Sequence, residues 1–210
     1  MRVLEEKILE YRRLAPEGWI ITAKDFLHAG SRSAVSRALV RLEKTGRLIR
    51  VSRGLYVAPV TGRFGTRAPA TQKVVYALAE RTHKLIVCSG ALAACHLGLT
   101  QQVPVREVFL TCGRARSLQL GKLTIKIQRA PRWQLALGKT IAGDAVRAMA
   151  WLGKPHAYEA AEKLYKLLPK CEWMALELTK PYLPGRRQKL SATPDLSGTV
   201  LPYVLFRTQR

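Results

Sequence analysis

The chain has 210 residues, of which 36 are Lys or Arg and 14 are Asp or Glu, so its net charge is +22 at pH 7. Hydrophobic residues make up 48% of it, which is enough for a buried core and excludes disorder by composition. So large a charge favours polyanionic partners: nucleic acid first, an acidic protein second, an anionic membrane third. A basic surface that serves solubility alone is the alternative. The positive excess is larger in residues 61–210 (+16) than in residues 1–60 (+6), so both parts are expected to be basic.

The first thirty residues predict two helices and a short strand. Residues 2–14 repeat apolar side chains on one helical face, and a proline and a glycine follow them. The apolar run 19–21 predicts a minor strand. A second, short helix is expected over residues 23–28, with Phe26 and Leu27 pointing inward.

Residues 31–57 are the stretch most typical of a DNA-binding motif. Ser31 is a good N-cap, and apolar residues at i, i+3, i+4 and i+7 from Val35 predict one buried helical stripe. Gly46 suits a left-handed C-cap. The opposite face of this helix is polar and basic with almost no acid, and a helix of this size fits the DNA major groove.

After that helix the apolar pattern changes to period two, and the turn at residues 52–54 predicts a β-hairpin. A helix, a helix-turn-helix and a hairpin together predict a winged helix-turn-helix over residues 1–60. The alternative is a small helical domain with a solvated basic face, such as a protein–protein adaptor.

Three kinds of DNA contact are predicted from this domain. Ser33, Ser36 and Arg37 are expected to face base edges, with Arg37 the candidate for a bidentate guanine contact. Basic side chains on the helix and the hairpin would bind phosphates, and the start of the short helix would hold the backbone from the other side. The full set of predicted DNA-binding residues is Thr22, Lys24, Ser31, Arg32, Ser33, Ser36, Arg37, Arg41, Lys44, Arg50 and Arg53.

Residues 61–70 contain prolines, glycines and arginines without periodicity and predict a linker. A second, mixed α/β domain is expected over residues 71–185, followed by an extended tail over residues 186–210. The fold class predicted for the whole chain is therefore α+β. The elements expected in the second domain are a helix from Thr71, a strand at 84–88, a helix at 91–99, strands at 105–111 and 122–128 with a hairpin connection between them, and helices from Ile141, Ala157 and Glu172.

The strand at 122–128 alternates strictly, with apolar residues on one face and a basic solvent face on the other. A second basic surface is therefore expected on this sheet, either to capture an acidic partner or to add phosphate contacts. Its predicted members are Arg106, Arg114, Arg116, Lys122, Lys126, Arg129 and Arg132.

No motif in the sequence predicts an enzyme, a cofactor or a metal. A phosphate-binding loop, a G-x-S-x-G elbow and an H-E-x-x-H pair are all missing. The four cysteines lack C-x-x-C spacing, so reduced thiols are favoured over a metal site at Cys88, Cys95 and His96. Glu159 and Glu162 are interpreted as a solvated helix face with local ion pairs rather than as a magnesium site.

No stretch reaches the roughly 18 apolar residues that a membrane span needs. The first residues include acids and no long apolar run, which does not predict a signal peptide. A cytoplasmic protein without a membrane partner is expected.

Two stretches carry a family resemblance. The run SRSAVSRALVRLEKTGRLIRVSRGLYVAP closes on Gly54, Tyr56 and Pro59, and the run LGLTQQVP over residues 97–104 follows in the second domain. Both are similar to the corresponding regions of the AbiEi family of bacterial antitoxins. The resemblance covers roughly residues 1–180 and leaves the tail unmatched.

The resemblance implies the antitoxin half of a type IV toxin–antitoxin pair of the abortive-infection kind. The N-terminal domain would repress its own operon by binding double-stranded promoter DNA with inverted repeats. The second domain would counter a nucleotidyltransferase-like toxin without requiring a stable complex. A monomer in solution that binds cooperatively on DNA fits this scheme. The alternatives are a winged-helix transcriptional regulator or a basic protein-interaction module, each without antitoxin activity.

Overall fold

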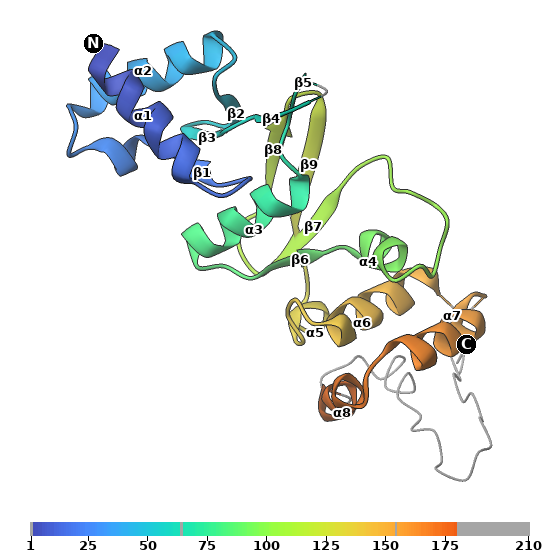
Figure 1. Cartoon of the computed structure of the whole chain (residues 1–210). Coiled ribbons are helices and arrows are strands. Elements are labelled where there is room, and N and C mark those ends of the chain that lie inside the picture. Colours follow the sequence, from blue (N-terminus) through green and yellow to red (C-terminus); the bar gives the residue numbers. More distant parts are fainter. Residues whose placement is uncertain (1, 64, 154, 180–210) are drawn as a thin grey trace. The chain divides into compact units, whose positions relative to one another are not determined.

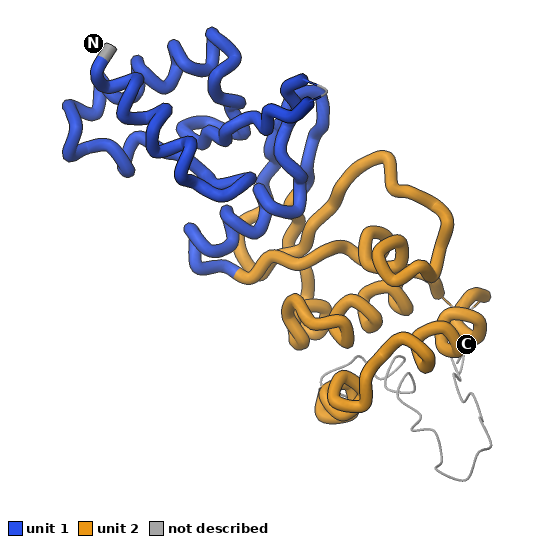
Figure 2. Tube along the Cα trace, in the orientation of Figure 1, with its two compact units in different colours: residues 1–84, 116–126 blue, residues 85–115, 127–210 orange. Residues whose placement is uncertain are grey.

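The computed structural model describes residues 2–63, 65–153 and 155–179. The predicted tail at 186–210 and the last residues of the predicted second domain lie outside this range. The described residues confirm the predicted mixture of helices and strands. They divide into two compact units, shown in Figure 2: the described residues of unit 1 fall within 2–84 and 116–126, and those of unit 2 within 85–115 and 127–179.

Unit 1 begins with a helix, a turn, a second helix and a β-hairpin (Figure 1). The three strands of this part form an antiparallel sheet in the order β1-β3-β2. Val57 of β3 lies opposite both Ile20 and Ile49, so β3 is the central strand. The elements are α1 (Arg2–Leu14), β1 (Ile20–Ile21), the 3₁₀ helix η1 (Ala23–Phe26), α2 (Arg32–Lys44), β2 (Ile49–Ser52) and β3 (Leu55–Val57).

Helix α2 has the boundaries and the buried face that its sequence predicts. The Ser31 hydroxyl accepts a hydrogen bond from the Ala34 amide at 3.3 Å, which caps the helix start. Gly46 takes a positive φ of 69° directly after the C-cap residue. The predicted apolar stripe packs into one core with Ile8 of α1 and Tyr56 of β3. Its buried members are Val35, Ala38, Leu39 and Leu42.

The short helix expected at residues 23–28 is instead a single 3₁₀ turn, and the prediction that Leu27 points inward is wrong. Phe26 is buried as predicted, whereas Leu27 is 49% exposed. The start of the turn is fixed locally, because the Thr22 amide donates to the Asp25 carboxylate at 2.8 Å. A 3₁₀ turn rotates each residue further than an α-helix does, which carries Leu27 away from the core.

The predicted linker at 61–70 contains a second hairpin. Strands β4 (Val60–Gly62) and β5 (Gly65–Arg67) pair antiparallel, with Val60 opposite Arg67. Backbone hydrogen bonds pair these short strands, and their side chains show no alternating pattern from which strands could be predicted.

Helix α3 (Thr71–Thr82), expected to open the second domain, belongs to unit 1. It buries Val74, Val75 and Leu78, and it lies against the segment after α1. Gly18 takes a positive φ of 82°, and a Cβ there would lie 2.8 Å from the Lys73 backbone. This close approach explains why the division between units falls after residue 84 rather than at the predicted linker.

Two strands that lie later in the chain complete unit 1. Residues 116–120, expected within a hairpin connection, form strand β8 (Arg116–Leu120), in which Leu118 and Leu120 are buried and Gln119 between them is exposed. It packs beside β2 and is joined by a turn to β9 (Leu123–Arg129). The division between the two units falls within β9, and the strands of this second sheet follow the order β6-β7-β9-β8.

Unit 2 is organised around α6, which packs against α4, α5, α7 and α8 (Figure 1). A Cβ at Gly90 would lie 2.5 Å from the Arg147 carbonyl oxygen, so α4 and α6 meet at a distance that only glycine allows. None of the helices within the described ranges is long and apolar enough to cross a membrane. The elements of unit 2 are β6 (Ile86–Cys88), α4 (Gly90–His96), β7 (Val108–Thr111), α5 (Arg132–Leu135), α6 (Ile141–Leu152), α7 (Ala157–Leu167) and α8 (Lys170–Thr179).

Candidate nucleic-acid interface

The polar face of α2 is exposed, as its sequence predicts. Ser33, Ser36, Arg37 and Lys44 are all exposed on it. Arg37 lies along the helix, since its Nε donates to the Ser33 carbonyl oxygen at 3.4 Å. Serine hydroxyls and an arginine on one exposed helix face are the groups that read base edges in a major groove.

Arg41, predicted to contact a phosphate, forms an ion pair within the fold. Its Nε lies 2.5 Å from the Glu5 carboxylate of α1, and both side chains are half-buried. A residue at this position points toward the flank of α2 that faces α1 and away from the centre of the exposed face. We therefore assign Arg41 to holding α1 and α2 together.

The Thr22 hydroxyl also forms hydrogen bonds within the fold. Its hydroxyl donates to the Asp25 carboxylate at 3.1 Å and accepts from Nη2 of Arg81 at 2.7 Å, and the residue is buried. These bonds leave the hydroxyl unavailable to a phosphate, contrary to the sequence prediction. Lys24, the other predicted residue of this turn, is exposed.

A cleft of about 800 Å³ lies beside α2 within unit 1. Its walls come from η1, α2, the β2–β3 turn, α3 and β8. Every charged residue that lines the cleft is a cation. These cations are Lys24, Arg32, Arg53, Arg81 and Arg116.

Four of the five cations carry uncompensated charge. Among the described residues, no ion pair or side-chain hydrogen bond involves Lys24, Arg32, Arg53 or Arg116. The fifth, Arg81, pairs with Asp25 at 2.5 Å. Unpaired cations around a cleft with low-dielectric walls concentrate a positive field there, which attracts anions.

The floor of the cleft is apolar and ends at a tyrosine. Leu39, Leu55 and Leu78 line it, together with Tyr56, which is almost fully buried. Burial raises the pKa of the Tyr56 hydroxyl and Glu43 adds to this effect, although the charge of Arg50 opposes it. The phenol is therefore neutral at physiological pH and can donate a hydrogen bond to an anion.

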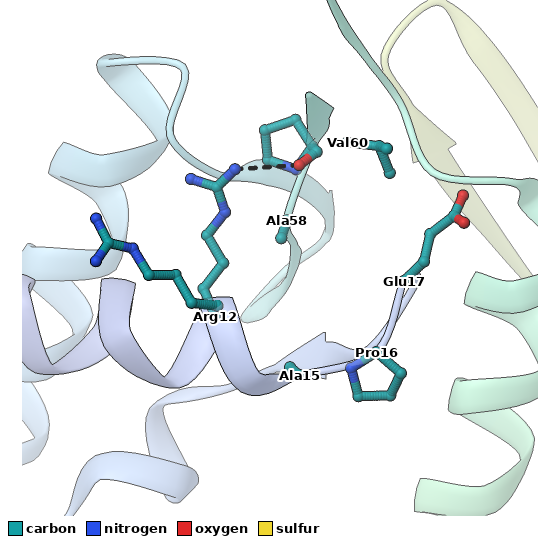
Figure 3. Close-up of a pocket in the computed structure, with 8 residues that line it drawn as sticks. Arg12, Ala15, Pro16, Glu17, Ala58 and Val60 are labelled. Atoms are coloured by element: carbon teal, nitrogen blue, oxygen red, sulfur yellow. Dashed lines mark hydrogen bonds between the residues drawn. The ribbon is translucent and has the colours of Figure 1, made fainter. Parts of the chain in front are cut away.

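A second, smaller hollow of about 290 Å³ lies where α1 ends near the start of β4 (Figure 3). Nη2 of Arg12 donates to the Pro59 carbonyl oxygen at 3.1 Å, and the carboxylate of Glu17 points away from Arg12. Glu17 binds Lys73, Arg67 and the Ala70 amide instead. Because Arg12 and Glu17, two of the three charged residues that line it, form hydrogen bonds within the fold, this hollow is a weaker candidate for a ligand site than the cleft.

The chain matches a known family model over most of its length. Residues 7–176 match the model of a family of unknown function, DUF6088. The chain belongs to this family. The match spans most of both units, so the DUF6088 region includes the cleft and the helices of unit 2. No curated protein matches the chain.

The residues predicted for a second basic surface of this DUF6088 chain are divided between the two units. Arg106, Arg114, Arg129 and Arg132 are exposed in unit 2, whereas the other three predicted members belong to unit 1. Within unit 1, Arg116 shares the face of β8 that buries two leucines and lines the cleft. The remaining two, Lys122 and Lys126, do not line the cleft. Lys122 lies in the turn before β9, and Lys126 points outward from β9. Successive side chains of a strand point to opposite faces, so basic residues that are close in the sequence can lie on different faces of the sheet.

Two cleft cations, Arg81 and Arg116, lie outside the predicted set of DNA-binding residues. For Arg116 a local signal was present, because Arg116, Leu118 and Leu120 follow the period of two that marks one face of a strand. For Arg81 no local signal exists, since its partners Thr22 and Asp25 are more than fifty residues away in the chain.

The described part of the chain holds no cluster of three or more metal-ligating side chains. All four cysteines are free thiols, and Sγ of Cys88 lies 3.9 Å from Nδ1 of His96. Glu159 forms the local ion pair expected of it, at 2.7 Å from Lys163. The hydrogen bond from that lysine lowers the pKa of Glu159.

Proposed function

We propose that this DUF6088 chain binds double-stranded DNA through residues 1–60, folded as a winged helix with α2 as the recognition helix and β2–β3 as the wing. The order of elements and the three-stranded sheet support this proposal. The basic face of α2 would enter the major groove, with Ser33, Ser36 and Arg37 at the base edges.

One observation supports this function above others. The exposed face of α2 adjoins a cleft lined by four unpaired cations and no carboxylate, and Ser36 belongs to both. A helix that reads bases beside a channel that attracts phosphates is the arrangement that duplex recognition requires. A solvated face that served solubility alone would not need its cations gathered around one concave, partly apolar surface.

The biological role proposed for this binding is that of a cytoplasmic type IV antitoxin. The chain would repress its own operon at inverted repeats in the promoter, and unit 2 would counter a nucleotidyltransferase-like toxin. The resemblance to AbiEi antitoxins in the runs at residues 31–59 and 97–104 supports this role. Two copies would bind cooperatively on the repeats, so a stable dimer in solution is not required.

A second candidate function is a basic module that captures an acidic protein. The exposed arginines of unit 2, at positions 106, 114, 129 and 132, favour it. Co-expression with the product of the neighbouring gene, followed by affinity capture, separates the two candidates. Retention of an acidic partner at physiological salt supports the module.

A binding titration tests the proposed function directly. The full chain is titrated into a fluorescein-labelled duplex of its own promoter and, separately, into a shuffled duplex of the same composition. Sequence-specific binding predicts a dissociation constant for the promoter at least about a thousandfold lower than for the shuffled duplex at physiological salt. Equal affinity for the two duplexes would contradict specific recognition, and absence of binding to either at low salt would contradict the proposed function altogether.

A further inference from the structure

We infer that the cleft beside α2 holds the sugar–phosphate backbone of the bound duplex, and that Arg116 of β8 is one of its phosphate-binding residues. This inference rests on the proposed function and extends it. The DNA-binding surface would then include a strand that lies outside the N-terminal domain and far from α2 in the sequence.

The direction of the Arg116 side chain follows from the geometry of its strand. Successive side chains of a strand point to opposite faces, so Arg116 shares a face with Leu118 and Leu120. Both leucines are buried, while Ser117 and Gln119, on the opposite face of the strand, are exposed. Arg116 therefore points toward the body of unit 1, and because it is the first residue of β8 its guanidinium reaches the cleft instead of the core.

No interaction within the described part of the fold explains why an arginine occupies this position. Within the described ranges, Arg116 makes no ion pair and no side-chain hydrogen bond, although it is half-buried. Withdrawing a guanidinium from water without an anionic partner costs free energy. A phosphate supplied by a ligand would provide the missing partner.

The four unpaired cations come from four different elements. Lys24 lies on η1, Arg32 on α2, Arg53 in the β2–β3 turn and Arg116 on β8. A compact anion would contact one or two of them, whereas an extended chain of phosphates can meet cations on several walls in turn. Arg81, which is held by Asp25, would position η1 rather than bind a phosphate.

The cleft also lies where the DNA backbone must pass. Ser36 lines the cleft and sits on the same exposed surface of α2 as Ser33 and Arg37. When that surface enters a major groove, one of the two strands that border the groove runs along the flank of α2 that carries Arg32 and Ser36. This position favours the backbone of the same duplex over a separate nucleotide.

The test measures the salt dependence of promoter binding for the full chain and three variants: Arg116→Gln, Arg116→Lys and Lys122→Gln. Each phosphate contact contributes about −0.9 to the slope of log K against log salt concentration. We expect Arg116→Gln to reduce the size of the slope by about one and Arg116→Lys to retain it, because lysine keeps the point charge. Lys122→Gln removes the same charge from the adjoining turn outside the cleft and should leave the slope unchanged.

Ethylation interference on the promoter duplex then locates the contact. One phosphate whose ethylation blocks the wild-type chain should lose that effect with Arg116→Gln, while the pattern with Lys122→Gln should match the wild type. Equal slopes and patterns for Arg116→Gln and Lys122→Gln would overturn the inference but leave the proposed function standing. Failure of the wild-type chain to bind any duplex would instead overturn the proposed function. If Arg116→Gln does not give a wild-type circular dichroism spectrum, Arg116→Met takes its place, with the same expected loss of slope and the same outcome against the inference.

Discussion

The Nη2 atom of Arg81 lies 2.5 Å from Oδ1 of Asp25 and links α3 to the turn before α2. The same guanidinium donates to the Thr22 hydroxyl and to the Ile20 carbonyl oxygen. One side chain thus ties together β1, η1 and α3, and the last two of these line the cleft. The position of the wall that carries Lys24 depends on this link.

Replacing Arg81 with Met should destabilise the chain by about 1.5–3 kcal/mol, the usual cost of removing hydrogen bonds to a charged group that is partly buried. Lys163→Met removes an exposed i, i+4 ion pair on α7 and should cost no more than about 0.5 kcal/mol. Urea denaturation followed by circular dichroism measures both. Equal losses for the two variants would show that Arg81 does not hold unit 1 together.

Gly18→Ala should be more destabilising than Gly46→Ala. Both glycines have positive φ, which costs an L-residue about 1–2 kcal/mol. Only at Gly18 would the new Cβ also collide with the backbone of Lys73, at 2.8 Å, while nothing lies within 4 Å of the corresponding position at Gly46. The difference in free energy of unfolding between the two variants therefore isolates the close approach of α3. If the variants lose the same stability, α3 does not lie against Gly18 in solution.

Glu17 should stabilise the chain in a pH-dependent way. The hydrogen bond from Lys73 lowers the pKa of its carboxyl, and the bond from the Ala70 amide acts in the same direction. A carboxyl whose folded pKa lies below its unfolded value contributes stability above the unfolded value, and this contribution disappears as the pH falls through the folded value. Wild type should thus exceed Glu17→Gln in urea midpoint at pH 7, and the gap should close below the ordinary glutamate pKa of about 4.3. A gap that stayed constant down to pH 3 would exclude this ion pair as its source.

Local sequence patterns predicted the elements well. The stripe from Val35 to Leu42 specifies the buried face of α2, because a 3.6-residue period can be read without knowing what packs against it. The same holds for the cap at Ser31 and for the alternation of β9. Each of these signals lies within a dozen residues of chain.

Partners far apart in the sequence could not be predicted. Arg41 matches a phosphate-binding residue in every local respect, but its position relative to Glu5 is set by how α1 crosses α2. The assignment of α3 to unit 1 depends likewise on Gly18 and Asp25, and the place of Arg116 depends on β8 packing beside β2. The sequence gives the net positive charge directly, but which basic side chains share one surface depends on how distant segments pack together.

The most direct test of the proposed function is the change in specificity caused by Arg37→Ala. The full-length variant, the wild type and Lys44→Ala are titrated with the promoter duplex and with a shuffled duplex of equal composition. If α2 reads bases, Arg37→Ala should weaken promoter binding by about 1–3 kcal/mol and leave binding to the shuffled duplex nearly unchanged. Lys44→Ala should instead weaken both duplexes alike. Equal promoter affinity for Arg37→Ala and the wild type would contradict the assignment of α2 as the recognition helix.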